Sequence, residues 1–169
     1  MTRIHLLRRG DPLPDEADPT GGLSPLGREH LERCAGALAR LGLWFDLIVS
    51  APDGGSIQSA KIVAMALDTP QAAILRDPAL RPAASATSLL DFLRACPSAR
   101  SILLVGDAPL LPRLASLMLS GEARSTPILD IELDYGGLLC LEAQQPFHNK
   151  AKLLWHLPPL VLVRLAEKS

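Results

Sequence analysis

Three short apolar segments, each followed by a turn and a helix-like segment, set the strongest limit on the fold of this chain. They are residues 4–7, 46–50 and 101–105. Parallel strands need a crossover connection between them, and a helix usually supplies it. Sheets built in this way carry helices on both faces. The sequence therefore predicts an α/β fold with three layers and a mainly parallel central sheet.

The helices are predicted from apolar periodicity and from capping residues. Ser24 and Pro25 begin a helix whose apolar residues share one face as far as Leu41, and Gly42 is a suitable stop. Gly54-Gly55 is expected to form only a tight turn or to leave an open groove beside it. Further helices are expected from Ser56 to Leu67, from Ser85 or Thr87 to Cys96, and from about Leu110 to Met118.

The last third of the chain has a different pattern, in which apolar segments follow one another without a long helix between them. Strands are expected over residues 128–133, 138–142 and 152–157. The apolar tail at 160–163 is expected to pack on the core or to meet a partner protein. No repeat and no second boundary is visible, so residues 1–169 are expected to form one domain.

Composition and charge limit the classes of function. The formal net charge is −1, which gives no basic surface for nucleic acid or for an anionic membrane. No segment approaches the roughly 18 apolar residues of a membrane span, and the start of the chain lacks the apolar stretch of a signal peptide. A cytoplasmic protein without nucleic-acid or membrane partners is expected.

Cysteine and histidine positions give no sign of a metal or cofactor. The three cysteines have no metal-like spacing and are expected to be reduced and mostly buried. No His-x-x-x-His or Cys-x-x-Cys pair occurs, so neither a metal site nor a cofactor is expected. His5 lies within the first apolar segment and is expected to pack there.

The turn after the first apolar segment is the strongest candidate for a site. It reads Arg8-Arg9-Gly10, and ligands of open α/β folds bind at the carboxyl edge of the sheet, where such a turn lies. Arginine guanidinium groups suit phosphate oxygens. Both arginines could also be solvated turn residues.

Several motifs together resemble the histidine phosphatase superfamily, whose members are phosphoglycerate mutase-like. Arg8-Arg9-Gly10 stands where that family has Arg-His-Gly, and the other matches cover the start of the first helix, the second turn and the turn after the third strand. The resemblance spans residues 3–120, and the short chain is similar to the SixA-type phosphohistidine phosphatase branch. The further matching segments are Leu23-Ser24-Pro25-Leu26-Gly27, Ser50-Ala51-Pro52 through Gln58-Ser59-Ala60, and Leu104-Val105-Gly106-Asp107-Ala108-Pro109.

The resemblance implies a catalytic set of which this chain keeps one member. The family uses a nucleophilic His, two Arg and a second His around the phosphoryl group, and only Arg8 matches. The nucleophile position is Arg9, the second Arg position is Gly55 and the second His position is Asp107. A protonated guanidinium cannot attack phosphorus. A further family Arg corresponds to Gly21 or Gly22, and Asp77 is the carboxylate nearest to the usual proton donor.

These replacements predict a catalytically inactive homologue, a pseudophosphatase, that binds a protein partner, phosphate or another small anion. The expected ligand contacts are Arg8, Arg9, Asp107 and Ser50. The alternative is a phosphatase or phosphoesterase with a non-standard site, in which Asp107 acts as base and the arginines clamp the anion. A third possibility is an unrelated α/β binding domain.

The opposite charges at two of the replaced positions suggest an internal plug. Arg9 and Asp107 stand where the two family histidines would face each other, so we expect an ion pair in the place of the phosphate, which Arg8 could join. Asp107 could instead, or in addition, cap the helix that follows it.

Overall fold

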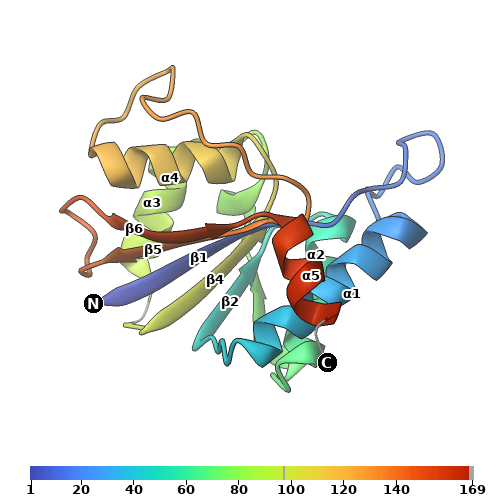
Figure 1. Cartoon of the computed structure of the whole chain (residues 1–169). Coiled ribbons are helices and arrows are strands. Elements are labelled where there is room, and N and C mark those ends of the chain that lie inside the picture. Colours follow the sequence, from blue (N-terminus) through green and yellow to red (C-terminus); the bar gives the residue numbers. More distant parts are fainter. Residues whose placement is uncertain (97, 168–169) are drawn as a thin grey trace.

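A six-stranded sheet forms the centre of the computed structural model, which describes residues 1–96 and 98–167 (Figure 1). The strand order is β3-β2-β4-β1-β5-β6. The pairs β1–β4, β2–β4 and β2–β3 are parallel, and β5 is antiparallel to both of its neighbours. The mainly parallel sheet predicted from the sequence is confirmed. The strands are β1 (Thr2–Arg8), β2 (Leu47–Ser50), β3 (Ile74–Arg76), β4 (Ser101–Gly106), β5 (Leu138–Ala143) and β6 (Lys152–Leu157).

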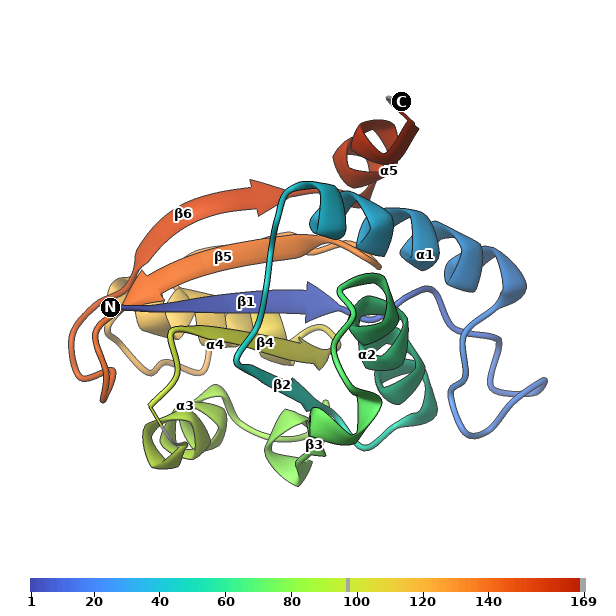
Figure 2. The ribbon, with the colours of Figure 1, turned by 90° about the horizontal axis from the view of Figure 1, so that it is seen from below.

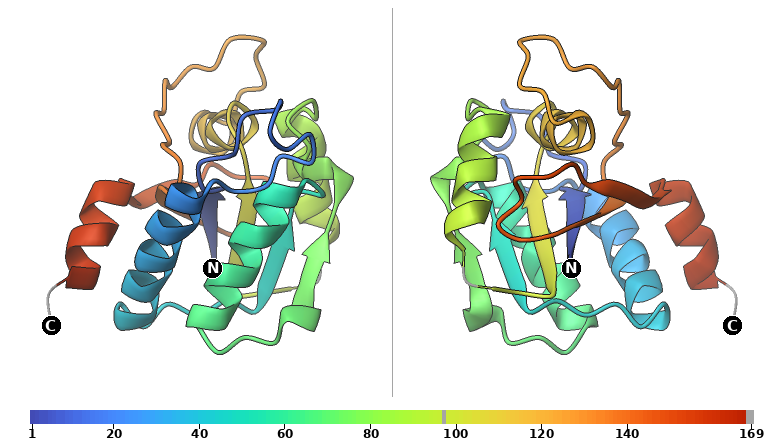
Figure 3. Two further views of the ribbon diagram at one scale, coloured as in Figure 1. Left: turned by 90° about the vertical axis from the view of Figure 1, so that its right-hand side faces the viewer. Right: turned by 90° about the vertical axis from the view of Figure 1, so that its left-hand side faces the viewer.

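Helices cover both faces of this sheet, which gives the three layers (Figures 2 and 3). One face packs against α1, α2 and α5, and the other packs against α3 and α4. Two short 3-10 turns, η1 and η2, flank β3. The helices and 3-10 turns are α1 (Pro25–Arg40), α2 (Gly54–Ala66), η1 (Gln71–Ala73), η2 (Pro78–Leu80), α3 (Ala86–Ala95), α4 (Leu110–Ser120) and α5 (Pro159–Glu167).

The central strand β4 shows how the sequence fills both cores. All six of its residues are buried, and their side chains alternate between the two faces. Ile102 and Leu104 join the core under α3 and α4, whereas Leu103 and Val105 join the core under α1 and α2. Each such side chain stabilises the fold by roughly 2 kcal/mol relative to exposure.

Three of the α-helices, α1, α2 and α3, have a side-chain cap at the N-terminus. Ser24 accepts the Gly27 N–H at the start of α1, and Ser85 accepts the Ser88 N–H at the start of α3. Asp53, and not Ser56, caps α2 by accepting the Ser56 N–H at 2.9 Å. The helix therefore begins at Gly54, which corrects the prediction that Gly54-Gly55 forms only a turn.

Residues 128–133 do not form the predicted strand. The neighbouring place beside β1 is taken by β5, so the segment has no partner strand and crosses over α4 instead (Figure 1). Its backbone is held elsewhere: the Leu129 N–H donates to the Ser116 hydroxyl at 3.0 Å.

The apolar tail is the helix α5, which packs on α1. Leu162 and Val163 are buried in the core of that face, while Leu160 is exposed. No described helix is long and apolar enough to cross a membrane.

Candidate functional site

The parallel pairing of β1 and β4 brings the turn residues of both strands together. Arg8 is paired with Gly106 at the carboxyl ends of the two strands, and the Arg9 N–H donates to the Gly106 carbonyl at 2.8 Å. Arg9 and Asp107 therefore leave the sheet side by side. This edge is where ligands of open α/β folds bind.

The Asp107 carboxylate binds both arginines. Its Oδ1 accepts Nε of Arg8 at 2.8 Å, and its Oδ2 accepts Nε and Nη2 of Arg9, both at 3.0 Å. The Ala108 N–H also donates to Oδ1, at 2.7 Å. The exposed fractions of the Arg8, Arg9 and Asp107 side chains are 20%, 15% and 12%. The ion pair expected between Arg9 and Asp107 is confirmed, and Arg8 joins it.

The remaining donors of the two guanidinium groups reach segments that are distant in the sequence. Nη1 of Arg8 donates to the Leu133 carbonyl at 3.0 Å, and its guanidinium carbon lies 3.9 Å from the centre of the Tyr135 ring. Nη1 of Arg9 donates to the Gly21 carbonyl at 3.2 Å. Neither arginine is a solvated turn residue.

The charges around Asp107 favour its ionised form. Burial raises the pKa of this carboxyl, but the hydrogen bond from Arg8, the charge of Arg9 and the Ala108 N–H together hold the pKa below its usual value. The carboxylate is therefore ionised at neutral pH. Asp107 does not cap α4, whose N-cap residue is Pro109 without a side-chain bond.

Gly55 makes room for the side chain of Arg9. A Cβ atom at position 55 would lie 2.7 Å from Nη1 of Arg9 and 2.6 Å from the Gly21 carbonyl oxygen. The space beside Gly55 is thus filled by the Arg9 guanidinium and by the loop backbone. The expectation that Gly54-Gly55 leaves an open groove is therefore wrong beside Gly55.

The loop before α1 is tied to the beginning of α2. The Gly54 N–H donates to the Thr20 carbonyl at 3.1 Å, and the Leu23 N–H donates to Oε1 of Gln58 at 2.9 Å. Within the loop, the Asp18 carboxylate accepts the N–H groups of Thr20 and Gly22. These bonds place the Gly21 carbonyl against Arg9.

Two further residues named from the sequence do not face this site. Ser50 is fully buried, and its hydroxyl donates to the Ala51 carbonyl at 2.7 Å. The Asp77 carboxylate caps η2 by accepting the Ala79 N–H at 2.8 Å. The geometry therefore removes Ser50 from the accessible ligand contacts and gives Asp77 a local structural role.

A cavity of about 370 Å³ opens beside Arg8. Its walls are the start of α4 and residues 127–134, and it includes the basic side chain of Arg113 and the acidic side chains of Asp130, Glu132 and Asp134. Sequence reasoning missed this wall and the Leu133 and Tyr135 contacts, because the segment carried only a strand-like pattern.

Within the described residues, no group of three or more His, Cys, Asp or Glu side chains is arranged to hold a metal ion. Cys34 and Cys140 are buried and Cys96 is partly exposed, and all three are free thiols. Burial raises the pKa of the Cys34 and Cys140 thiols to about 11. Neither thiol is therefore an activated nucleophile.

Comparison with solved structures identifies proteins that share the fold of this chain, whereas the sequence comparisons find no match. No family model and no curated protein sequence matches the chain. A structure of the protein histidine phosphatase SixA complexed with tungstate aligns with a TM-score of 0.82 and 19% identity, over 95% of this chain and 99% of that one.

Two further structures agree. One is assigned as a phosphohistidine phosphatase SixA from Agrobacterium tumefaciens (TM-score 0.74, 25% identity, 94% of this chain and 98% of that one). The other is assigned as an α-ribazole-5′-phosphate phosphatase from Escherichia coli K-12 (TM-score 0.75, 15% identity, 94% and 98%). The chain has the fold of the histidine phosphatase superfamily, as the sequence resemblance predicted.

Proposed function

We propose that this protein is a pseudophosphatase, a catalytically inactive member of the histidine phosphatase superfamily that acts by binding a protein or an anionic ligand. One observation carries the proposal: the guanidinium of Arg9, the residue that the resemblance puts at the nucleophile position, is bound to Asp107. The fold shared with phosphatases supports the family origin.

The chemistry of Arg9 excludes the covalent route of the family. That route needs a nitrogen lone pair that attacks phosphorus, and a guanidinium remains protonated and only donates hydrogen bonds. Losing the nucleophile together with its neighbouring groups leaves no simple rescue. Gly55 and Asp107 supply neither a cation nor an imidazole in the places where the family has them.

The ion pairs also oppose phosphate binding at the old position. A phosphoryl group there would approach the ionised carboxylate of Asp107 and would compete with it for the Arg8 and Arg9 donors. The carboxylate already occupies these donors within the molecule, without the entropic cost of binding a free ligand. Asp107 therefore acts as an internal substitute for the anion.

The alternative of a non-standard phosphatase needs Asp107 as general base. Both of its oxygens accept hydrogen bonds, and its pKa lies below the usual value, so it is a weak base at neutral pH. The arginines that would clamp the substrate are bound to this same carboxylate. No contact of the site favours this second function.

The binding role rests on the surface beside the plugged site. Arg8 lines the cavity of about 370 Å³ together with Arg113, and acidic side chains line its other wall. This mixture of charges suits a protein segment that carries both signs, or an anion that approaches Arg8 and Arg113 from the α4 side.

The test measures phosphate-ester hydrolysis and anion binding on the same pure sample. We expect no hydrolysis of p-nitrophenyl phosphate or of a phosphohistidine peptide above buffer, while an active SixA phosphatase assayed in parallel turns over. Thermal shift with phosphate, sulfate and vanadate then reports any remaining anion site. Turnover that disappears in the Arg8→Ala variant would contradict the proposal, because a contaminating enzyme would not depend on Arg8.

A further inference from the structure

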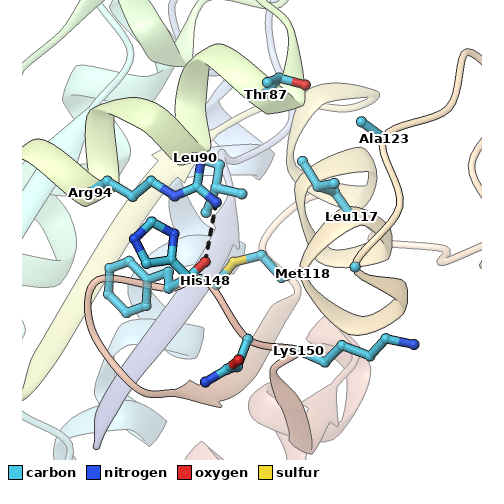
Figure 4. A pocket seen from close by; sticks show the side chains of 11 residues that line it. Thr87, Leu90, Arg94, Leu117, Met118, Ala123, His148 and Lys150 are labelled. Atoms are coloured by element: carbon cyan, nitrogen blue, oxygen red, sulfur yellow. Dashed lines mark hydrogen bonds between the residues drawn. The ribbon is translucent and has the colours of Figure 1, made fainter.

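We infer that a second cavity, at the other end of the sheet from Arg8, binds a small organic anion with an apolar body. The cavity has a volume of about 440 Å³ and lies between α3, α4 and the turn that joins β5 to β6 (Figure 4). That turn follows Ala143, which pairs with Thr2 at the beginning of β1, whereas Arg8 ends the same strand. The volume lies within the range of small-molecule sites.

The charge of the lining selects the class of ligand. Eleven residues line the cavity; three of them are the basic residues Arg94, His148 and Lys150, and none is Asp or Glu. The Arg94 guanidinium and the His148 ring lie near each other at the cavity, whereas Lys150 lines it with its stem and its ammonium points away (Figure 4). Basic side chains at a hollow raise the local concentration of anions. This cavity differs in that respect from the one beside Arg8, whose lining includes Asp130 and Glu132.

Arg94 is held at the cavity and retains unused donor capacity. It donates to the Phe147 carbonyl at 3.4 Å (Figure 4) and to the Asp91 carboxylate at 2.9 Å, while its buried Nε has no partner among the residues that the structure describes. Because Nε has almost no exposed surface, an oxyanion in the cavity would be bound by the Nη donors that are still free. A guanidinium already fixed in orientation loses little freedom when it binds a carboxylate or phosphate.

The stem of Lys150 lies close to Gly121 beside the same cavity. A Cβ atom at Gly121 would lie 3.1 Å from Cε and 3.2 Å from Cγ of Lys150, so the lysine stem lies against the end of α4. Gly121 has φ of +75° and ends that helix in the left-handed conformation. The absence of a side chain at position 121 thus allows both the helix stop and the close approach of Lys150.

The turn that carries the basic residues is anchored to the core. Phe147 is buried, and the Ala151 N–H donates to the Met118 carbonyl at 2.8 Å. Leu90, Leu117 and Met118 supply the apolar part of the lining. A ligand with a carboxylate or phosphate head and an apolar body matches this division of the lining.

The inference does not rest on the proposed loss of catalysis. Its test follows the amide signals of this cavity and those of the Arg8–Arg9 turn separately. The ¹⁵N-labelled full chain is titrated with phenylphosphonate, which is anionic, partly apolar and not hydrolysed. We expect saturable shifts of the amide signals of residues 117–123 and 147–150. Benzyl alcohol, which keeps the ring but has no charge, should produce much smaller shifts.

A pair of double variants tests the role of charge. His148→Gln with Lys150→Gln should weaken phenylphosphonate binding at least tenfold. The matched control is Lys152→Gln with His156→Gln, which removes the same residue types from β6, where neither lines the cavity. The control should bind like the unmodified chain, and dispersed amide spectra will verify that both variants fold.

Four outcomes would overturn the inference, and the first three concern the strength and selectivity of binding. They are no saturable shift at millimolar phenylphosphonate, equal binding of benzyl alcohol, and equal weakening by both double variants. Shifts confined to residues 8–10 and 106–108 would reject this cavity as well, because they would place the anion at the Arg8–Arg9 turn. That last result would also reveal an anion site at the turn, which concerns the proposed function and not this cavity.

Discussion

Arg9 and Gly55 fit each other in space, since a Cβ atom at position 55 would lie 2.7 Å from Nη1 and 3.3 Å from Cδ of Arg9. The sequence resemblance puts the nucleophile of the family at position 9 and an arginine at position 55. Compared with the family residues that this resemblance implies, position 9 carries a longer side chain and position 55 carries none, so the two differences are complementary. The present position of Arg9 and any side chain at residue 55 exclude each other.

We predict that Gly55→Ala destabilises the protein. The new methyl group would contact the Gly21 carbonyl as well as Arg9, and the backbone oxygen cannot move as easily as a side-chain end. Overpacking of this kind costs about 1–3 kcal/mol, whereas alanine in place of glycine in a helix gains at most about 1 kcal/mol. Urea unfolding followed by circular dichroism measures the difference.

The control for this variant is Gly36→Ala on α1. A Cβ atom at Gly36 meets nothing within 4 Å, so the exchange should stabilise the protein by about 0.5–1 kcal/mol. If Gly55→Ala were as stabilising as Gly36→Ala, the close packing of Arg9 on Gly55 would be disproved.

We predict that Asp107→Ala lowers stability and creates a site for anions. Removing the carboxylate leaves two guanidinium groups without their shared partner, a loss of roughly 2 kcal/mol for hydrogen bonds to a charged group. Sulfate should then raise the melting temperature of the variant more than that of the unmodified chain, because it can take the place of the carboxylate.

Glu32→Ala is the matched control for that experiment. Glu32 pairs with Arg28 at 3.8 Å on the surface of α1, and both side chains are more than half exposed. Its loss should change stability by less than about 0.5 kcal/mol and leave the sulfate response unchanged. An equal sulfate response in Asp107→Ala and in the unmodified chain would refute the internal plug.

The central part of the site could be predicted from the sequence because it depends on strand ends and on the family resemblance. Parallel strands place their carboxyl ends at one edge, so apolar segments followed by Arg8-Arg9 and by Asp107 bring those residues together. The resemblance implies that positions 9 and 107 face each other, and their opposite charges then predict the ion pair.

The partners of Arg8 could not be found in this way. Leu133 and Tyr135 follow residues 128–132, whose alternation is typical of a strand, but β5 already pairs with β1 on that side. Alternation of apolar and polar residues tells which side chains are buried and not which strand edge is free.

The role of Gly55 was hidden for a related reason. Adjacent glycines usually mark a turn, and the side chain that needs the space belongs to Arg9, more than forty residues earlier. Only the packed fold brings the two positions together.

We predict that stability falls between pH 6.5 and pH 4 because of His5. Burial, opposed by the contact of Nδ1 with the Ile102 carbonyl, lowers the pKa of His5 from 6.5 to about 4. The unfolded chain therefore binds a proton in this window that the folded chain does not, so stability is present above pH 6.5 and is lost as the pH falls. The expected loss between pH 7 and pH 5 is about 2 kcal/mol.

The variant His5→Phe isolates this contribution. It keeps an aromatic ring against Phe45 and Trp155, whose ring centres lie 5.0 Å and 5.5 Å from that of His5, but cannot take up a proton. The free energy of unfolding of the variant should fall by about 2 kcal/mol less than that of the unmodified chain between pH 7 and pH 5. Parallel losses in the two proteins would show that His5 is not the titrating group.

The last prediction concerns Asp18, which orders the loop over the plugged site. Its carboxylate accepts the Thr20 hydroxyl at 2.6 Å and the N–H groups of Thr20 and Gly22 at 2.9 Å and 3.0 Å. Asp18→Ala should therefore speed amide hydrogen exchange at Thr20 and Gly22, while Asp15→Ala, in the exposed part of the same loop, should not. Because Gly21 lies between those two residues, its contact with Arg9 should weaken. Unchanged exchange in Asp18→Ala would mean that the bonds to α2, and not the Asp18 carboxylate, fix the loop.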